Sequence, residues 1–475
     1  MADVRIIMNS GAEDVLREAA VAELKGRLRG RLLRAGDDGY DAARKIWNGM
    51  IDKRPALIAR CAGAGDVITC VNFARDHDVV LAVRGGGHNV AGNAACDAGL
   101  MIDLSGMKSV HVNPGRRTAR AEAGVTWGEF DHETQVFGLA TTGGQVSTTG
   151  VAGLTLGGGW GWLARKYGLA SDNLMSVDIV TADGQLRTAS DSENADLFWG
   201  VRGGGGNFGV VTSFEYRLHP VGPVVGGFVF YPFAIAREVL QRYRELTHTA
   251  PDELAVDAAL LTLPDGAKVA GIAACYCGPV AEGECLLAPL KKLGTPVVDQ
   301  LGPTSYTAVQ TMLDASYPSG MQHYWKSSFL HDVGDNAIDT MIAHCTALAS
   351  PLCHALLEYQ LGGAVGRIDR DTTAFAARDA QHAFVALGLC TDPAEAKRCT
   401  QWARDFWEAM QPFSTGGVYV NYLGREGDEG AERVRAAYGA DKYQRLLALK
   451  EKYDPTNLFR LNQNIKPTVV ARQWQ

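Results

Sequence analysis

The sequence predicts an α+β fold of two domains. A chain of 475 residues is too long for one ordinary hydrophobic core. Strand-like and helix-like runs occur in both halves, and the composition changes at about residues 219–222. Before this point glycines concentrate between residues 85 and 209, whereas after it glycines are fewer and long helical runs alternate with strands. We therefore expect a domain boundary at about 219–222.

Composition and charge narrow the class of protein. Hydrophobic residues make up 46% of the chain and charged residues 21%, as in a soluble globular protein. The net charge of −7 argues against a broad surface for nucleic acid or anionic membranes. No apolar run approaches the roughly 20 residues of a membrane span, and the N-terminus lacks the basic start and apolar core of a secretory signal. We expect a cytoplasmic protein.

The ten cysteines predict neither a disulfide framework nor a metal site. They are scattered, and only Cys275 and Cys277 are close together. A C-x-C pair lacks the spacing and partners of a zinc site. Most of the cysteines are therefore expected to be small buried side chains of a protein in a reducing compartment.

The first part of the chain has a β–α–β rhythm of the α/β kind. Residues 13–29 have the pattern of an amphipathic helix rich in Glu, Lys and Arg. Another helix is expected to begin near Asp66, which is a good N-cap, before a strand that ends at Arg84. Asp183-Gly184 predicts a hairpin turn between two strands.

The remaining elements follow from apolar periodicity. Extended or strand segments are expected at residues 54–59, 99–104, 117–125, 176–182, 209–218, 225–231, 254–262, 268–277 and 354–360. Helices are expected at residues 40–50, 193–199, 234–249, 280–292, 336–349, 393–410 and 428–452.

The stretch RGGGHNVAG, residues 84–92, follows the strand that ends at Arg84. Successive glycines let backbone N–H groups turn toward one point, which makes a cradle for an anion such as a phosphate. His88 stands at the edge of this cradle, where a bound ligand would lie. The alternative interpretation is a plain glycine-rich turn with a surface histidine.

Two further glycine-rich segments lie in the same domain: TTGGQVSTTGVAGLTLGGGWG at 141–161 and GGGGNFG at 203–209. Neither contains a Walker loop, and neither opens a helix with the Rossmann spacing. Three such loops in one domain indicate backbone that approaches an extended ligand, and a dinucleotide or FAD has that length. The alternative is structural, because glycine also lets turns pack tightly.

The order of the motifs resembles that of a known family. RGGGH is followed by the glycine segment that continues into RKYGLASDN, then by FWGVRGGGGNFGVV at 198–211, and finally by YDPTNLFRLNQNI at 453–465. Together they resemble the berberine-bridge-enzyme-like FAD-linked oxidases, which have the vanillyl-alcohol-oxidase or PCMH-type flavoprotein fold. The resemblance covers residues 30 to 466.

This resemblance implies the organisation of the chain. It predicts an FAD-binding α+β domain at residues 1–219, completed by 420–475, and a substrate-binding domain at 220–419 with an antiparallel sheet covered by helices. The cofactor-binding positions carried over from the motifs are Arg84, Gly85, Gly86, Gly87, His88, Asn89, Gly92, Thr142, Gly143, Thr148, Thr149, Gly150, Gly153, Leu154, Gly158, Gly159, Gly161, Asn173, Gly209, Val211, Asn462 and Asn464. For Asn464 the alternative is a turn residue that caps the last strand.

The resemblance also implies that His88 bonds covalently to the 8α-methyl carbon of the flavin. An imidazole nitrogen must be neutral to add there, and the bond raises the flavin potential. Many relatives form a second bond from a cysteine, but this position is Val146 here and no cysteine lies nearby. We therefore expect FAD bound covalently through one histidine.

Alcohol oxidation needs a base, and the family often uses a tyrosine. In the segment GVYVNY, residues 417–422, the first choice is Tyr422 and the alternative is Tyr419. If the segment is a strand, the two side chains point to opposite faces, and either one can instead be a packed aromatic. A lowered tyrosine pKa needs a nearby cation, and Lys326 or Arg378 would supply one.

Substrate contacts are expected from the second domain. Tyr324, Trp325, Lys326, Glu358 and Gln360 lie on strand-like segments that would face a cavity, although such residues can also be core.

The resulting function is the oxidation of an alcohol, hemiacetal or related group of a small molecule. Hydride passes to flavin N5, and molecular oxygen is the expected acceptor, giving hydrogen peroxide. In relatives the position of Thr149 gates oxygen, and threonine has the size of the valine found in oxidases. The alternatives are a dehydrogenase with another acceptor and a non-catalytic flavin- or ligand-binding protein. The sequence does not select the substrate.

Overall fold

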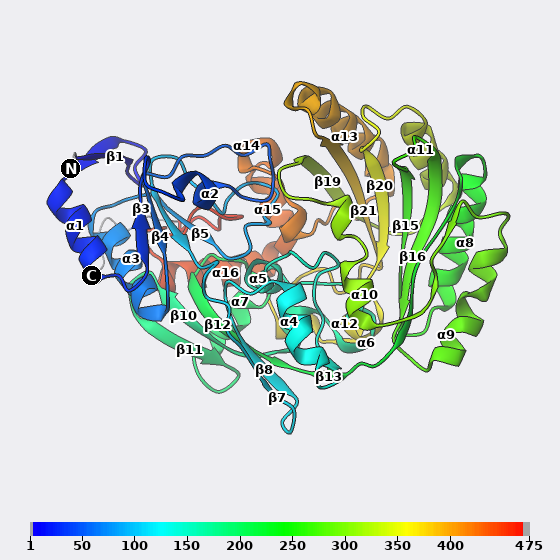
Figure 1. Cartoon of the computed structure of the whole chain (residues 1–475), viewed down its shortest axis with the longest axis horizontal. Helices are drawn as coiled ribbons and strands as arrows, with labels where there is room; N and C mark the ends of the chain where they lie inside the picture. The colour runs from blue at the N-terminus through cyan, green and yellow to red at the C-terminus, as the bar shows by residue number, and fades with distance from the viewer. Residues whose placement is uncertain (1–2, 469–475) are drawn as a thin grey trace.

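The computed structural model describes residues 3–468. It confirms the predicted α+β class, with two groups of sheets side by side (Figure 1). None of the helices between residues 3 and 468 is long and apolar enough to cross a membrane.

The first group contains a four-stranded and a five-stranded sheet. The four-stranded sheet has the order β3 (Arg31–Leu33), β4 (Leu57–Arg60), β6 (Leu100–Asp103), β5 (Leu81–Arg84), and β4, β6 and β5 are parallel. The five-stranded sheet is antiparallel, in the order β11 (Leu186–Ser190), β10 (Leu174–Thr181), β12 (Gly209–Arg217), β8 (Thr118–Glu122), β7 (Val110–Asn113). Two short antiparallel pairs join β1 (Val4–Ile7) to β2 (Glu13–Leu16) and β9 (Leu139–Ala140) to β13 (His219–Pro220).

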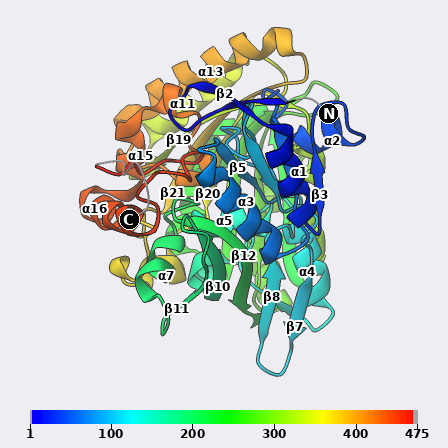
Figure 2. The same cartoon turned by 90° about the vertical axis from the view of Figure 1, so that its left-hand side faces the viewer.

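Helix α3 (Ala64–Asp76) lies between these two larger sheets, as Figure 2 shows. It buries Val67, Cys70, Val71 and Ala74 between them. The other helices of this part are α1 (Glu18–Arg27), α2 (Tyr40–Arg44), α4 (Trp127–Gln135), α5 (Val151–Leu156), α6 (Ala164–Tyr167) and α7 (Ala195–Val201). The two sheets and α3 thus form one core beneath the glycine-rich loops.

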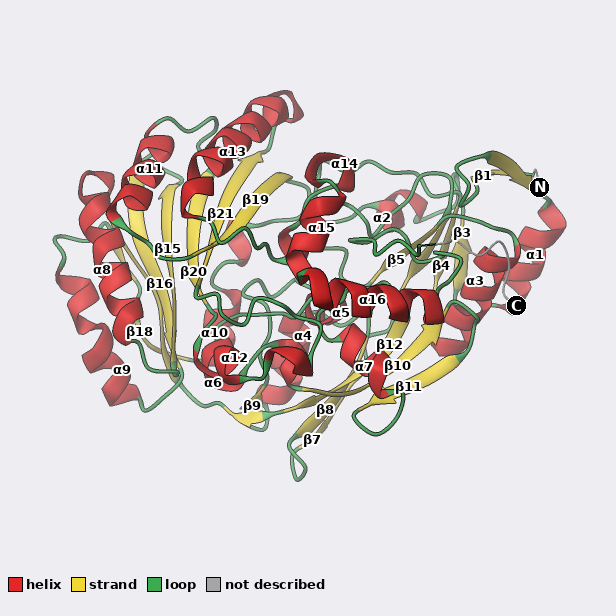
Figure 3. Ribbon diagram, turned by 180° about the vertical axis from the view of Figure 1, so that it is seen from behind, coloured by secondary structure: helices red, strands yellow, loops and turns green. Residues whose placement is uncertain are grey.

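The second group is one eight-stranded antiparallel sheet that begins at Val224. Its order is β17 (Val298–Asp299), β14 (Val224–Pro232), β16 (Lys268–Tyr276), β15 (Leu254–Thr262), β20 (His354–Tyr359), β21 (His382–Cys390), β19 (Gln322–Leu330), and β18 (Gly302–Thr304) also pairs with β14. Helices α8 (Ala236–Thr249), α11 (Asp335–Thr346) and α13 (Ala396–Met410) cover its outer face (Figure 3). The shorter helices α9 (Val280–Leu287), α10 (Tyr306–Thr311) and α12 (Gly363–Arg367) surround it. The inner face of the eight-stranded sheet is not covered by α8, α11 and α13 and faces the first group of sheets.

The end of the chain returns to the first group of sheets. Helices α14 (Glu426–Glu429), α15 (Ala431–Tyr438) and α16 (Ala440–Tyr453) lie there, coloured orange to red in Figure 1. The fully buried Lys450 donates hydrogen bonds to the carbonyls of Asn207, at 2.9 Å, and Phe459, at 2.8 Å. It also pairs with Asp454 at 2.7 Å. These bonds hold the terminal segment against the third glycine-rich loop.

Most expected elements are present, and the hairpin at Asp183-Gly184 is confirmed by the antiparallel pairing of β10 with β11. Residues 13–29 are not one helix, because residues 13–16 form β2 and pair with β1 before α1 begins. Asp66 is not an N-cap either. It lies inside α3, and its carboxylate accepts hydrogen bonds from the backbone N–H groups of Arg29, Gly30 and Ala62.

Two predictions near the C-terminus are also corrected. The expected helix 428–452 is broken at Gly439, whose φ is +73°, into α15 and α16. The segment Val420–Tyr422 is a 3-10 turn rather than a strand. Because of this turn, Tyr419 and Tyr422 do not point to opposite faces, and their ring centroids lie 5.0 Å apart.

Candidate active site

A cavity of about 880 Å³ lies between the inner face of the second sheet and the glycine-rich loops of the first part. Its walls come from all three glycine segments, from inner-face residues of the second sheet and from the terminal segment. One side of the cavity is the glycine wall, made of residues 85–89, 144–154, 205–211 and 459–463. The other side is the sheet wall, made of the inner-face residues of β14, β15, β20, β21 and β19. Both walls therefore line the same cavity.

The glycine wall is built by close approach of backbone. Gly86, just after β5, lies against Gly150, the N-cap of α5, so closely that a Cβ on Gly86 would be 2.5 Å from Gly150 N. Only two residues without side chains fit at this contact.

The glycine wall also leaves room for a ligand. A Cβ on Gly153 or Gly206 would meet nothing within 4 Å, although both residues line the cavity. Asn462 lines it too, and its buried Oδ1 has no hydrogen-bond partner within the described chain. Bare backbone beside open space, with an unsatisfied polar atom, fits an extended cofactor such as FAD.

The predicted cofactor residues fall into two groups. Those that line the cavity are Gly85, Gly86, Gly87, His88, Asn89, Thr149, Gly150, Gly153, Leu154, Gly209, Val211 and Asn462. Those that the structure places behind the wall are Arg84, Gly92, Thr142, Gly143, Thr148, Gly158, Gly159, Gly161, Asn173 and Asn464.

The second group holds the wall in shape. A Cβ on Gly143 would be 2.6 Å from the Trp127 ring, and one on Gly161 would be 2.0 Å from the Gly143 carbonyl oxygen. The tight-packing interpretation of the glycine clusters is therefore the right one for these positions. Arg84 likewise makes a two-pronged ion pair with Asp103, at 3.0 and 2.8 Å, which ties β5 to β6.

His88 lies on the cavity wall in a fixed orientation. Its Nε2 is 2.9 Å from Thr148 Oγ1, and its ring stacks on Trp47 with the centroids 4.3 Å apart. Burial lowers the pKa of His88 to about 4, so the imidazole is neutral at physiological pH. This is the protonation state that nucleophilic attack by the ring requires.

Trp47 joins the two walls and was not predicted from the sequence. Its other face stacks on His323 of β19 at 3.8 Å, and its Nε1 donates to the Tyr317 carbonyl at 3.0 Å. The adjacent Asn48 donates to the carbonyls of Val90, at 2.8 Å, and His323, at 2.9 Å. The chain around Trp47 thus connects the loop that carries His88 to the second sheet.

Tyr422 and Glu358 form a hydrogen-bonded pair inside the cavity. The Tyr422 hydroxyl donates to Glu358 Oε1 at 2.9 Å, and the buried Glu358 Oε2 has no partner among residues 3–468. Burial and the nearby Asp257 raise the pKa of Glu358 well above its usual value. Burial and the charge of Glu358 also raise the pKa of Tyr422 well above its usual value, so Tyr422 is a neutral phenol rather than a phenolate.

Tyr419 also lines the cavity, but its hydroxyl is occupied. It accepts hydrogen bonds from the backbone N–H of Gly159, at 2.9 Å, and from Asn421 Nδ2, at 2.8 Å. Its ring stacks on Trp160 with centroids 3.6 Å apart. Tyr419 therefore braces the wall, and Tyr422 is the better placed of the two to meet a substrate.

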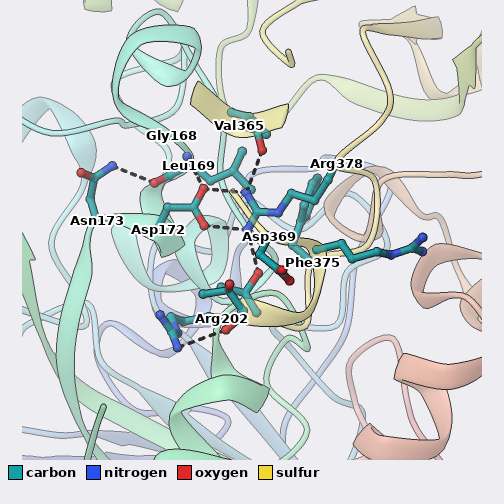
Figure 4. Close-up of polar contacts among 12 residues, drawn as sticks. Gly168, Leu169, Asp172, Asn173, Arg202, Val365, Asp369, Phe375 and Arg378 are labelled. Atoms are coloured by element: carbon teal, nitrogen blue, oxygen red, sulfur yellow. Dashed lines mark hydrogen bonds and ion pairs between the residues drawn. The ribbon is translucent and has the colours of Figure 1, made fainter. Parts of the chain in front are cut away.

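Neither expected cation reaches these tyrosines. Figure 4 shows Arg378 donating two hydrogen bonds to the Asp172 carboxylate, both at 2.7 Å. Lys326 pairs with Glu429 at 3.0 Å and with Asp428 at 3.5 Å. Both cations are neutralised in contacts that join distant parts of the chain, so the prediction that they lower a tyrosine pKa is wrong.

Strand alternation sorts the predicted substrate residues. Trp325 and Glu358 line the cavity. Tyr324 and Lys326 do not, because neighbours of Trp325 on β19 point to the opposite face. Gln360 follows the end of β20 and does not line the cavity, but it donates to Asp257 Oδ1 at 2.8 Å.

Asp257 is a second carboxylate on the sheet wall. It stands directly opposite Glu358 in the pairing of β15 with β20, so both side chains project from the same face. Gln145 and Gln360 donate to it, and burial raises its pKa to about 6. A signal for Asp257 exists in the sequence, since it is the one charged residue in the apolar strand LAVDAALLT. Other residues missed are Trp47, Trp160, Tyr317 and His354, for which no comparable signal exists.

Comparisons with known proteins agree with this arrangement. Residues 55–190 match the family described as FAD binding domain, and residues 418–466 match the one described as berberine and berberine like. The chain is 32% identical over 452 residues to an FAD-linked oxidoreductase of Dictyostelium discoideum, covering 94% of this chain and 97% of that one. It is also 32% identical over 466 residues to (R)-6-hydroxynicotine oxidase of Paenarthrobacter nicotinovorans, with 93% and 97% covered.

A solved structure shows the same architecture. The crystal structure of 6-hydroxy-D-nicotine oxidase from Arthrobacter nicotinovorans superposes with a TM-score of 0.85 at 30% identity, covering 92% of this chain and 98% of that one.

Proposed function

We propose a reaction for this chain, which belongs to the berberine-bridge-enzyme-like family of FAD-linked oxidoreductases. The proposed reaction is the oxidation of an alcohol or hemiacetal carbon of a natural product or carbohydrate. The family and the two-domain flavoprotein fold agree with the resemblance carried by the motifs. The protein is an FAD-linked oxidoreductase acting on a small molecule. The proposal concerns the reacting group, the electron acceptor and the attachment of the cofactor.

One observation carries this proposal. The Tyr422–Glu358 pair and the glycine wall face the same cavity, so a molecule bound against the sheet wall lies between a proton acceptor and the cofactor site. When bound, FAD supplies an acceptor for hydride at N5. The residues of the chain must then bind the substrate and remove a proton.

Tyr422 and Glu358 provide the route for that proton. The substrate hydroxyl gives its proton to Tyr422 Oη as the Tyr422 proton passes to Glu358 Oε1, along the 2.9 Å hydrogen bond. The raised pKa of Glu358 makes its ionised form a stronger base than an ordinary carboxylate. Oxygen is the proposed electron acceptor, supported by the modest size of Thr149, which lines the cavity.

The test is a screen of benzylic alcohols, polyphenols and sugars for peroxide release, followed by Tyr422→Phe on any substrate found. We expect kcat to fall by roughly 10²–10⁴-fold, because general acid–base catalysis contributes about that factor. Flavin absorbance per protein should be unchanged. Equal kcat in Tyr422→Phe would contradict the proton route, and a reduced protein that reoxidises in air only over many minutes would contradict oxygen as the acceptor.

We also propose that His88 holds FAD covalently and alone. The support is the neutral imidazole, its fixed orientation on Thr148 and Trp47, and its place on the cavity wall. Val146 occupies the position where many relatives have a cysteine, and none of the ten cysteines, all within the described chain, lines the cavity.

Acid precipitation tests this attachment. Wild-type protein should keep its yellow colour in the pellet and give a fluorescent band on a denaturing gel. His88→Ala should lose the fluorescent band completely, because this chain has no cysteine at position 146 to form a second covalent bond to the flavin. A colourless wild-type pellet, or a band that survives in His88→Ala, would show that the attachment is absent or lies elsewhere.

A further inference from the structure

We infer that the substrate is a hydrophobic amine: an apolar body whose protonated nitrogen binds at Asp257 and Glu358. This rests on the proposed function only in placing the substrate on the sheet wall. It narrows the range of molecules, because it disfavours both neutral sugars and anionic compounds.

The side chains of the sheet wall indicate that the body of the substrate is apolar. Phe228 and Phe230 stack on each other at 4.8 Å on β14, and Leu356, Leu387 and Trp325 continue the surface across β20, β21 and β19. These strands contribute mainly apolar side chains to the cavity. A sugar would leave its hydroxyls without partners on such a surface, which is costly.

The polar group of the substrate follows from the two carboxylates. Asp257 and Glu358 lie opposite each other on neighbouring strands, and both face the cavity. No lysine or arginine between residues 3 and 468 lines the cavity to neutralise them. Glu358 Oε2 is buried and makes no hydrogen bond in the described part of the chain, so it can accept from a donor that arrives with the ligand. The indole N–H of Trp160, which is also buried without a hydrogen bond in the described chain, lies near enough to Glu358 to lower its pKa.

The charge state of the pair points the same way. The pKa of Asp257 is about 6, so this group is ionised at neutral pH, whereas burial and Asp257 hold the pKa of Glu358 well above its usual value. Asp257 therefore gives the pair negative charge at neutral pH in a largely apolar space, and ionisation of Glu358 adds to it. A bound cation offsets that charge, while an anion adds to the repulsion.

The aromatic residues around the pair favour the same ligand. Trp325 and Tyr422 meet edge to face at 5.4 Å, and Trp160 meets Tyr422 in the same way at 5.5 Å. Aromatic faces attract an ammonium group when water is excluded.

Three probes of one skeleton test the inference on the flavin-loaded protein at pH 7: 4-phenylbutylamine, 4-phenylbutan-1-ol and 4-phenylbutyrate, with cellobiose as a sugar. Binding is measured by calorimetry or by the change in flavin absorbance. The amine should bind at least about tenfold more tightly than the alcohol, because a hydrogen bond to a charged group exceeds a neutral one by roughly this factor. The carboxylate and cellobiose should bind more weakly than either.

Two variants locate the effect. Glu358→Gln should reduce amine affinity by about tenfold to a hundredfold and alcohol affinity by a clearly smaller factor, and Asp257→Asn should act in the same direction. Glu284→Gln, an exposed acid on α9, is the matched control and should change nothing. Equal wild-type affinity for amine and alcohol, or tighter binding of the carboxylate or cellobiose, would overturn the inference.

Binding is measured here without turnover. The amine preference can therefore fail while peroxide production stands, or hold while the screened alcohols are not oxidised.

Discussion

The glycine wall and the sheet wall enclose one cavity but are built in opposite ways. The glycine wall presents backbone, and Gly86 and Gly150 touch there without any side chain between them. The sheet wall presents side chains, every second residue of strands such as β15 and β20. Backbone suits a cofactor that many proteins share, because N–H groups are the same in every residue. Side chains suit a substrate that differs from one protein to the next.

The strongest way to break the glycine wall is Gly86→Ala. The new Cβ would lie 2.5 Å from Gly150 N and 2.6 Å from Gly150 Cα, which are backbone atoms with little freedom to move. We expect the free energy of unfolding to fall by roughly 1–3 kcal/mol or more, and most of the flavin to be lost. Thermal unfolding and the ratio of flavin to protein absorbance measure both effects.

Gly106→Ala is the matched control. Its Cβ would come no closer than 3.9 Å to the Cys61 carbonyl oxygen, and Gly106 is exposed. Comparable destabilisation in both variants would mean that the loss is general to glycines of this part and not specific to the contact.

A smaller change, Gly153→Val, separates room for the cofactor from stability of the wall. Gly153 lies in α5 and lines the cavity, and a Cβ there meets nothing within 4 Å. The apoprotein should melt at the same temperature or slightly higher, because valine is a better helix former than glycine by a few tenths of a kcal/mol. Flavin content should fall, since the side chain would project into the cavity. Full flavin content would show that the cofactor does not approach this residue.

Asp257→Asn tests the sheet wall and is expected to have the smallest effect of these substitutions. The pKa of this carboxyl is raised from 3.8 to about 6 in the folded protein. Its contribution to stability is therefore fully present below about pH 4 and is lost as the pH rises through 6. Relative to wild type, the variant should gain of order 1–3 kcal/mol between pH 4.5 and pH 7.5. Thermal denaturation at the two pH values measures this gain, and a constant difference would argue against a raised pKa of Asp257.

The contrast also explains what the sequence could predict. The fold class, the hairpin at Asp183-Gly184 and most cavity-lining glycines follow from short contiguous motifs. The sheet wall comes from strands that are far apart in the chain, so no motif brings Asp257 and Glu358 together. The prediction that Tyr324 faces the cavity is wrong, because three consecutive residues of one strand cannot share a face.

Local pattern also failed where tertiary contacts decide the conformation. Residues 13–16 have helical periodicity, but the edge of β1 makes them a strand. Asp66 has the chemistry of an N-cap, but its carboxylate satisfies the N–H groups of a neighbouring loop. Trp47 lies in an unremarkable stretch of sequence, and only the fold places it between His88 and His323.

That position of Trp47 limits how the protein can move. Opening the cavity by a hinge between its walls would separate Trp47 from His323 and break the hydrogen bond from Asn48 to the His323 carbonyl. The cavity also reaches the surface near Leu263, Pro264 and the half-exposed Leu352. A substrate that enters over this apolar rim would not need the two walls to separate.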